Sequence, residues 1–382
     1  MKHTVLAILL AYVLTAASAR ASADGSLLNL GPEELVQANG VDIDVGTYSV
    51  PSFDYWDSDD RKDLIVGTGN GKVRVYLNVG TESDPQFSDY FYAQSNGSDL
   101  YCPPSGCLGC FPRVVYWDAD DRKDLLVGLA AGTVKIFLNI GTDENPTFDA
   151  GANIRVGDPG IWNLAVGTRA TPTFVDWNSD GMTDLVVGAL DGKIHIYLNC
   201  GCTWPIPAFY YSPTAGVSAK RDDLDLLVPG SRSSPVILDL DRDGKKDVLT
   251  GNTNGQLLFY NNVGTDDAPS FSGYSLVESN GVPIDLPGPP RSRPFVCYWT
   301  EDAYPDVLIG ASDGKVHLYR GIPTPGDMDG DGDVDFADFS AFAACWNQAD
   351  GAQCDAADFT GDGQVNADDL HQFATNWLTG VE

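Results

Sequence analysis

The last part of the chain holds two acidic loops of twelve residues in which oxygen-bearing side chains recur at alternate positions. One begins at Asp327 and the other at Asp358, and the sixth position of each is glycine, Gly332 and Gly363. Oxygen ligands at positions 1, 3, 5, 9 and 12, a position 7 that offers its carbonyl, and this glycine turn are how protein loops hold Ca²⁺. The sequence therefore predicts two calcium sites. Their candidate ligands are Asp327, Asp329, Asp331, Asp333, Asp335, Asp338, Asp358, Thr360, Asp362, Gln364, Asn366 and Asp369.

Two segments in the middle of the chain carry a related pattern of oxygen side chains, again with a glycine between the acids. Without a cation, carboxylates roughly 5 Å apart repel by about 1 kcal/mol per pair in water and by a few times that at an effective dielectric near 20. We therefore expect calcium in both loops. The plainer alternative is a polar hairpin turn that is rich in Asp for solubility. The candidate ligands are Asp176, Asn178, Asp180, Asp184, Asp239, Asp241, Asp243 and Asp247.

Three further segments depart from this pattern. Tyr55 and Tyr116 stand in the first ligand position of two of them, and Asp60 and Asp121 replace the glycine. We expect weaker calcium sites in these two, built from Asp57, Asp59, Asp63, Asp118, Asp120 and Asp124. In the fifth segment, which begins at Tyr298, too few ligands remain for a metal site.

The five segments are copies of one repeat, whose starts lie 61, 60, 63 and 59 residues apart. In each copy a short apolar run such as Asp63 to Gly67 precedes a turn such as Asn70-Gly71, and an alternating run such as Lys72 to Leu77 follows. Apolar and alternating runs joined by Asn-Gly or Asp-Gly turns predict antiparallel strands. Meanders repeated at this interval indicate a mainly β fold, a five-bladed β-propeller, with the acidic loops between strands.

The two ends of the repeat array predict closure of the ring. The last copy stops at Tyr319-Arg320 without its final strand, whereas Leu35 to Val45 resembles the inter-repeat stretch Leu276 to Leu286. We therefore expect an N-terminal strand to complete the fifth blade.

Phrases such as FVDWNSDGMTDLVVGALDGKIHIYLN resemble the FG-GAP/VCBS repeat family, whose propeller units are also seen in integrin α chains. The resemblance covers about residues 24 to 322. It implies that each acidic loop joins the first two strands of a blade and holds Ca²⁺. Trp56, Trp117, Trp177 and Trp299 recur at one repeat position, which favours packing between blades over stacking on sugar rings.

The acidic tail resembles a type I dockerin, on the evidence of its duplicated loops, of Asp at position 12 and of the phrase DFTGDGQVNADDL. Helical segments are expected at Phe339 to Trp346 and Leu370 to Leu378. The resemblance implies calcium and a cohesin-like partner recognised through positions ten and eleven. Those positions hold Phe336, Ala337, Ala367 and Asp368, of which Phe336 departs from the small polar residues common there. The alternative is a calcium-stabilised C-terminal cap.

Composition limits the cellular setting. Residues 1–23 have the basic start, apolar core and small-residue end of a secretory signal, so we expect a secreted protein. The formal net charge of -31 disfavours nucleic acid and anionic membrane surfaces as partners, and no segment is long enough to insert in a membrane.

Eight cysteines favour disulfides, among them Cys345 with Cys354, while zinc at Cys102, Cys107 and Cys110 is the alternative.

The expected domains are thus a signal peptide (1–23), a propeller (24–322), a linker (323–326) and a dockerin-like module (327–382). No catalytic residue is predicted, because the acids outside the repeat show no pairing and His195 and His317 are expected at the surface. We expect a secreted, calcium-binding, non-catalytic adhesion protein whose propeller displays a surface for a carbohydrate or protein ligand. The alternative is a polysaccharide-active hydrolase or lyase attached through its dockerin.

Overall fold

The computed structural model describes residues 28–105, 109–118, 120–156, 162–199, 209–210, 220–221, 224–271, 273–288, 290–330, 334–348 and 354–377. They form two compact units, a larger one of Leu30–Leu238 and Lys245–Arg320 and a smaller one from Gly321 onward. The Asp239–Gly244 loop joins two strands of the larger unit and is described with it. The expected signal peptide, together with Cys107, Cys200, Cys202, Asp331 and Asp333, lies outside the described residues.

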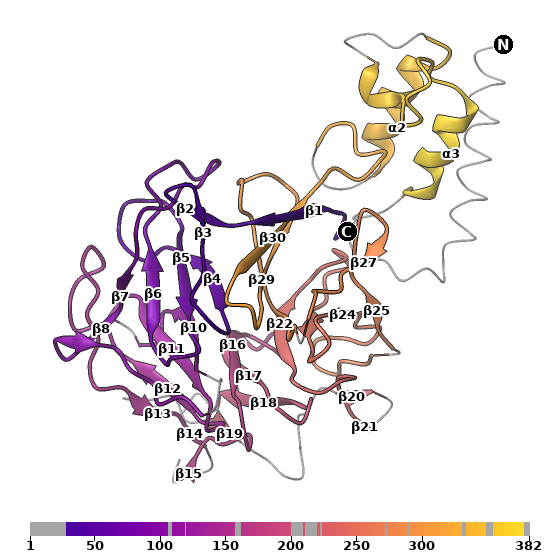
Figure 1. Cartoon of the computed structure of the whole chain (residues 1–382). Coiled ribbons are helices and arrows are strands. Elements are labelled where there is room, and N and C mark those ends of the chain that lie inside the picture. Colours follow the sequence, from indigo (N-terminus) through magenta and orange to yellow (C-terminus); the bar gives the residue numbers. More distant parts are fainter. Residues whose placement is uncertain are drawn as a thin grey trace. The chain divides into compact units, whose positions relative to one another are not determined.

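The larger unit is a five-bladed β-propeller with four strands in each blade (Figure 1). Blade one has β4 (Val50–Asp54), β5 (Asp63–Gly67), β6 (Val73–Tyr76) and β7 (Phe91–Tyr92). Blade two has β10 (Cys110–Val115), β11 (Asp124–Leu129), β12 (Val134–Phe137) and β13 (Ala152–Asn153). Blade three has β16 (Thr171–Val175), β17 (Asp184–Gly188), β18 (Ile194–Asn199) and β19 (Phe209–Tyr210). Blade four has β22 (Ser234–Leu238), β23 (Asp247–Gly251), β24 (Leu257–Tyr260) and β25 (Ser275–Leu276).

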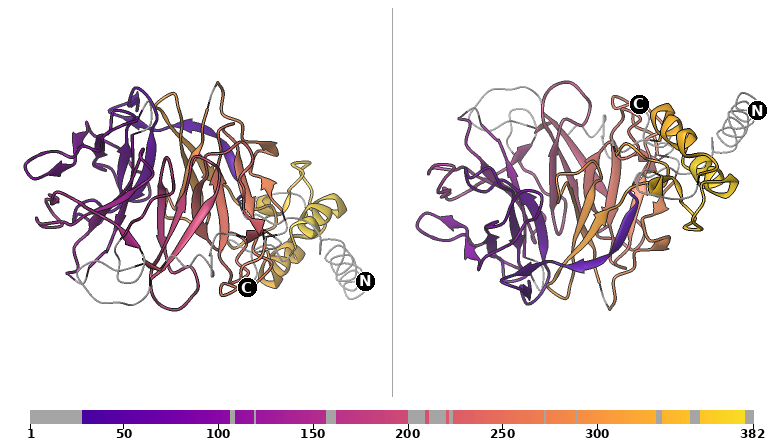
Figure 2. Two further views of the ribbon diagram at one scale, coloured as in Figure 1. Left: turned by 90° about the horizontal axis from the view of Figure 1, so that it is seen from below. Right: turned by 90° about the horizontal axis from the view of Figure 1, so that it is seen from above.

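Blade five confirms the expected closure of the ring. It consists of β28 (Arg293–Cys297), β29 (Asp306–Gly310), β30 (Val316–Gly321) and the N-terminal strand β1 (Leu30–Leu35), which lies beside β30 (Figures 1 and 2). The closure also corrects one expectation, because His317 is buried rather than at the surface. The strand β1 brings Glu33 over it, and a Glu33 carboxylate oxygen lies 2.6 Å from His317 Nδ1.

Short hairpins connect one blade to the next. They are β2 (Gln37–Ala38) with β3 (Val41–Asp42), β8 (Gln94–Ser95) with β9 (Ser98–Asp99), β14 (Arg155–Val156) with β15 (Trp162–Asn163), β20 (Lys220–Arg221) with β21 (Leu224–Asp225), and β26 (Glu278–Ser279) with β27 (Val282–Pro283). Two of them pair in parallel with an outer strand of the next blade, through Val156 to Phe209 and through Ser279 to Leu30. The hairpins thus fasten neighbouring blades at their outer edges.

The core of the propeller lies between the blades. Trp56, Trp117, Trp177 and Trp299 are all buried, and each packs among apolar side chains of its own blade and the next. The prediction that these tryptophans are core residues is therefore confirmed. The first strands of the blades contact one another in a closed ring, β4 to β10, β16, β22, β28 and back to β4, so these five strands surround the axis.

An asparagine that follows the third strand of blades one, two and four shapes the loop to the fourth strand. Buried Asn78 accepts hydrogen bonds at Oδ1 from the backbone amides of Gly80 (2.9 Å) and Gln86 (3.1 Å) and donates to the Thr81 carbonyl (3.0 Å). Asn139 and Asn262 make the same pair of bonds in their own loops. The loop conformation therefore depends on one amide side chain.

Replacing Asn78 with Ala should lower the free energy of unfolding by about 1–3 kcal/mol, because two partly buried backbone amides lose their acceptor. Urea unfolding checks this. Asn163→Ala, at an exposed position of β15, is the control and should change stability by less than about 0.5 kcal/mol. Equal effects of the two substitutions on stability would contradict this role of Asn78 in its loop.

The smaller unit is helical. It contains α2 (Phe336–Cys345), the short 3₁₀ helix η1 (Asp355–Ala357) and α3 (Ala367–Thr375). Phe342 and Phe373 are fully buried at its centre, and the predicted disulfide between Cys345 and Cys354 is present, with Cα atoms 5.5 Å apart. Within the described part of the chain, no helix is both long and apolar enough to cross a membrane.

Candidate metal centres

The two loops of the smaller unit bring their first and last acids together. Carboxylate oxygens of Asp327, Asp329 and Asp338 all lie within 4.8 Å of one another. In the second loop Asp358, Asp362 and Asp369 do the same. Positions five and seven of the first loop, Asp331 and Asp333, lie outside the described residues.

The loop backbone folds around these carboxylates. Asp358 accepts hydrogen bonds from the amides of Gly361 (2.8 Å) and Gly363 (2.7 Å), and Asp362 accepts from the amide of Gln364 (2.9 Å). The bonds to Asp358 hold its pKa below the usual range against the opposing effect of desolvation. The Thr360 hydroxyl points to Asp358, at 3.3 Å. Three of the six predicted ligands of the second loop, Asp358, Asp362 and Asp369, therefore surround one centre.

Positions nine and twelve of each loop also start a helix. Asp335 and Asn366 are the N-cap residues of α2 and α3, and the carboxylates of Asp338 and Asp369 accept the backbone N–H of these caps at 2.8 Å. This reciprocal arrangement is a capping box. With these caps the two helices start at Phe336 and Ala367, three residues before the starts that apolar spacing predicted.

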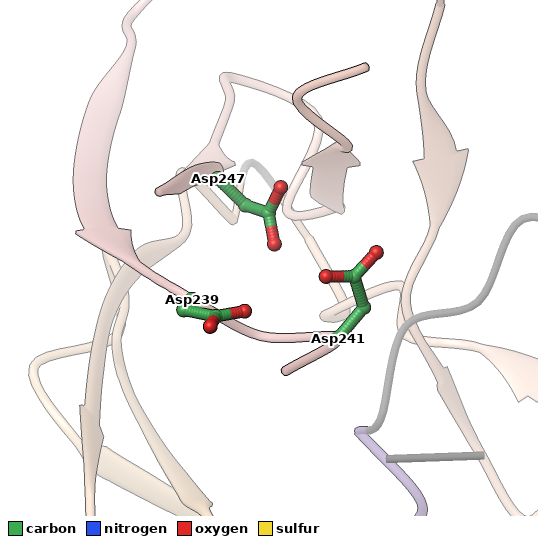
Figure 3. A group of neighbouring side chains, drawn as sticks. All are labelled: Asp239, Asp241 and Asp247. Carbon is green, nitrogen blue, oxygen red and sulfur yellow. The ribbon is translucent and has the colours of Figure 1, made fainter. Parts of the chain in front are cut away.

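Blade four places three predicted ligands around one point. Carboxylate oxygens of Asp239, Asp241 and Asp247 lie within 4.8 Å of one another, and Figure 3 shows the three side chains converging, two from the loop after β22 and Asp247 from the start of β23. Asp239 accepts from the Gly244 amide at 2.9 Å, which closes the loop. The fourth predicted ligand, Asp243, is not a member of this group.

Blade three has a more open loop. Asp176 accepts the amides of Asp180 (3.1 Å) and Gly181 (2.9 Å), while the Asn178 side-chain amide donates to Asp180 at 3.0 Å. Among the described residues Asp176, Asp180 and Asp184 do not form a group within 4.8 Å, so the predicted ligands share a loop but not one centre. In blade five, Asp302 accepts a hydrogen bond from the Thr300 hydroxyl at 2.7 Å.

In blades one and two an arginine forms an ion pair with one of the predicted ligands. The Arg61 guanidinium pairs with the Asp59 carboxylate and donates from Nε to the Asn78 carbonyl at 2.8 Å. Arg122 pairs with Asp120 in the same way. The backbone amides of Asp59 and Asp120 bond to Asp57 and Asp118, so these acids keep the local loop geometry.

The loop turn itself is retained in blades one and two although the glycine is missing. Asp60 and Asp121 adopt φ of 59° and 60°, where Gly181 and Gly244 have 85° and 80°. Aspartate tolerates this left-handed conformation better than most residues. The loops of blades one and two therefore keep the same turn as those of blades three and four.

The closing aspartate of every propeller loop has a structural role that the sequence interpretation missed. Asp63, Asp124 and Asp184 are fully buried, and each accepts one backbone amide from the tryptophan of its loop and another from the end of the third strand. Burial raises the pKa of Asp63 to about 7 and that of Asp124 to about 6, against these hydrogen bonds. The signal was available, since Asp306 keeps this position in the blade that has lost its other ligands.

The distances and charges within the three groups of acids can be compared with what a Ca²⁺ site requires. Oxygens that share a Ca²⁺ at 2.3–2.6 Å lie at most about 5 Å apart, and the three groups of acids meet this limit. At 4.8 Å and an effective dielectric near 20, each ionised pair repels by roughly 3 kcal/mol. From Gly326 onward the sequence has no Lys or Arg to offset this repulsion. The two loops of the smaller unit therefore fit a hard divalent cation.

Family comparison agrees with the geometry. Residues 325–374 match the dockerin type I domain, and residues 176–250 match the FG-GAP-like repeat. The chain carries FG-GAP-like repeats and a dockerin type I domain. Both resemblances inferred from the sequence are thus confirmed, and the dockerin match contains both loops of the smaller unit.

Other comparisons add little to the dockerin and repeat assignments. A search of curated proteins gave no match. Among solved structures, an Agrocybe aegerita lectin that recognises non-reducing terminal N-acetylglucosamine has 17% identity and a TM-score of 0.35, covering 71% of this chain and 62% of that one. A putative glucose dehydrogenase from Thermus thermophilus has 12% identity and a TM-score of 0.40, covering 76% and 100%.

Positions ten and eleven of both dockerin loops are exposed at the start of a helix. Phe336 and Ala337 open α2, and Ala367 and Asp368 open α3. Phe336 is 61% exposed although its ring lies against Trp377, with centroids 5.0 Å apart. The dockerin domain thus presents the same two positions twice.

Replacing Asp358 with Ala should weaken calcium binding at the second dockerin loop by at least about tenfold, because the first ligand and the acceptor of the loop amides are both lost. Isothermal titration calorimetry of the full chain checks this. Asp368→Ala removes an exposed carboxylate one residue from the twelfth ligand and should leave calcium binding unchanged. Unaltered titration of Asp358→Ala would contradict the assignment.

Replacing Arg61 with Met, the residue that blade three carries as Met182, should remove the internal cation of blade one. In chelator we expect a loss of stability of about 1 kcal/mol or less, since the ion pair is partly exposed, and calcium should restore it. Thermal unfolding with and without calcium measures the loss of stability in chelator and its recovery in calcium. Arg155→Met, at an exposed position of β14, is the control. A calcium response equal to that of the unmodified chain would refute this role for Arg61.

Proposed function

We propose that this chain is a secreted, non-catalytic binding protein that docks through its dockerin domain onto a cohesin-bearing partner while its propeller binds a ligand. The observation that carries the proposal is the paired exposure of positions ten and eleven on the calcium-type loops of the dockerin domain. A cap needs no exposed phenylalanine, whereas aromatic side chains are enriched at protein interfaces.

Calcium supports docking by fixing the helix starts. Asp327, Asp329 and Asp338 would hold one ion, and Asp358, Asp362 and Asp369 the other. Because Asp338 and Asp369 also cap α2 and α3, an ion bound to them orders the residues that face the partner. At 100 times its dissociation constant, calcium stabilises the folded domain by about 2.7 kcal/mol per site. Docking should therefore require calcium.

Several acids outside the repeated loops have structural partners, which favours binding over catalysis. Glu34 pairs with Arg320 at 3.0 Å, and Asp99 pairs with Lys72 at 2.7 Å. A glycoside hydrolase needs two carboxyl groups facing one substrate about 5–10 Å apart. Acids engaged in ion pairs at the outer strands are poorly suited to that task. We therefore propose that the propeller binds a carbohydrate or protein ligand without cleaving it.

A calcium-dependent pull-down tests docking. The full chain is mixed with a panel of purified type I cohesin modules in calcium or in EDTA, and affinities are measured by calorimetry. We expect at least one cohesin to bind in calcium and none in EDTA. The double variant Phe336→Ala with Asp368→Ala should bind at least about tenfold more weakly, because the duplicated contacts are removed together.

The matched control is Glu278→Ala, which removes an exposed carboxylate of the propeller strand β26 and should leave cohesin affinity unchanged. Absence of binding to every cohesin in calcium would overturn the docking proposal and leave the domain as a cap. Release of reducing sugar from a polysaccharide panel would instead establish the enzyme alternative.

A further inference from the structure

A groove of about 660 Å³ lies where the ring closes, between blade five and blade one. It is lined by β1 and β30 of blade five, by the hairpin of β2 and β3 into which β1 leads, and by residues of the blade-one loop from Val79 to Phe87 (Figure 1). Ligand pockets in proteins usually have about 300–1,000 Å³. This groove, called the closure groove below, is therefore large enough for an organic ligand.

Two charged residues of the closure groove break the repeat. The pairing of the second and third strands puts Arg320 where the first three blades have leucine. These leucines are Leu77, Leu138 and Leu198. Register with the third strand puts Glu34 of β1 where blade one has Phe91. A blade can therefore form with apolar residues at both positions, and its fold does not require the two charges.

Closure of the ring leaves the ends of these two strands accessible. In blade one the chain passes from the third strand β6 to the fourth strand β7 through the loop that follows Asn78. In blade five the third strand β30 ends at Gly321, and the fourth strand β1 comes from the N-terminal part of the chain, so no such loop joins them. The side chains of Arg320 and Glu34 are accordingly 37% and 47% exposed.

Arg320 supplies hydrogen-bond donors to the closure groove. Its Nε donates to Glu34 Oε1 at 3.0 Å. Ion pairs as exposed as this one contribute little to stability, so closure of the ring depends little on it. A guanidinium carries five N–H donors, and this bond uses only the one on Nε. The two Nη groups of Arg320 can therefore donate to oxygens of a ligand.

Three amide side chains supply acceptors. Gln37, Asn39 and Gln86 line the groove, and each donates from its amide nitrogen to an aspartate carboxylate, at 3.0, 3.1 and 3.2 Å. The aspartates are Asp42, Asp89 and Asp84. Because a carboxylate takes the nitrogen end of each amide, the oxygen end is the one that a ligand can use. A ligand that donates hydrogen bonds therefore suits the groove.

Apolar side chains complete the lining. The rings of Phe87 and Trp299 lie 5.6 Å apart between centroids, and both are nearly buried. Val79, by contrast, is 62% exposed at the edge of the blade-one loop. Ligand pockets usually combine an apolar lining with a few polar groups that fix orientation. A sugar ring matches both parts, since its C–H faces are apolar and its hydroxyl groups both donate and accept.

We propose that the closure groove binds a neutral sugar unit of the propeller's ligand. This rests on the proposed function of the propeller as a binding module. Sugar hydroxyls would donate to the oxygens of Gln37, Asn39 and Gln86 and accept from Arg320. An acidic sugar fits poorly, because aspartates hold the three amides and the chain has a net charge of -31.

Calorimetry of the full chain in calcium tests the groove, with neutral oligosaccharides from cellulose, xylan, mannan and chitin and with oligogalacturonate as the acidic comparison. We expect at least one neutral oligosaccharide to bind. Arg320→Leu, which installs the residue of blades one to three, should bind it at least about tenfold more weakly, because donors from a charged group are lost.

The matched control is Lys72→Leu. Lys72 pairs with Asp99 at 2.7 Å, the two side chains are 32% and 38% exposed, and Lys72 does not line the groove. This substitution should leave sugar affinity unchanged.

A second variant keeps the test decisive should Arg320→Leu not fold. Gln86→Met removes one amide oxygen from an exposed side chain of similar length and should weaken binding about three- to tenfold. Crystals of the full chain with the bound oligosaccharide should show a sugar ring beside Arg320 and Gln86.

Sugar binding that Arg320→Leu and Gln86→Met retain at the affinity of Lys72→Leu would overturn the proposal. Failure of every neutral oligosaccharide to bind, or binding of oligogalacturonate alone, would do the same. Cohesin docking should be unchanged in Arg320→Leu, so a failure of docking and a failure of sugar binding remain distinguishable.

Discussion

Neutralisation of clustered carboxylates is the constraint on which this molecule depends. The chain has 54 acidic residues against 23 basic ones, and many of the acids are held close together in loops. Blades one and two offset them with Arg61 and Arg122. The dockerin loops have no such residue, so their folded conformation is suited to an external cation. The propeller loops and the dockerin loops thus meet the same electrostatic problem in two different ways.

Backbone bonding makes these loops part of the fold and not additions to it. The buried closing aspartate of each propeller loop ties two strands together, and the twelfth aspartate of each dockerin loop caps a helix. A single carboxylate therefore holds two parts of the backbone together in each of these loops. Because desolvation opposes ionisation of Asp63 and Asp124, a nearby positive charge stabilises the fold at the same points.

The two ends of the innermost strands of the propeller carry side chains of opposite charge. Acids gather where the innermost strands end, and arginines gather where they begin. Strand direction alone creates this polarity, because all five innermost strands run the same way around the ring.

The sequence by itself determined the repeat, the number of blades, the closing strand and the dockerin loops, because each depends on local spacing of apolar residues, turns and acids. It also placed the tryptophans between blades and suggested a bridge between Cys345 and Cys354, which the structure contains. Tertiary structure alone decided that His317 is covered by Glu33, that Asp243 is not a member of the group of acids in blade four, and that Arg169 and Arg293 both lie over the Phe111 ring. These contacts join residues from different blades or opposite sides of a loop. They depend on closure of the ring in three dimensions, which no local pattern specifies.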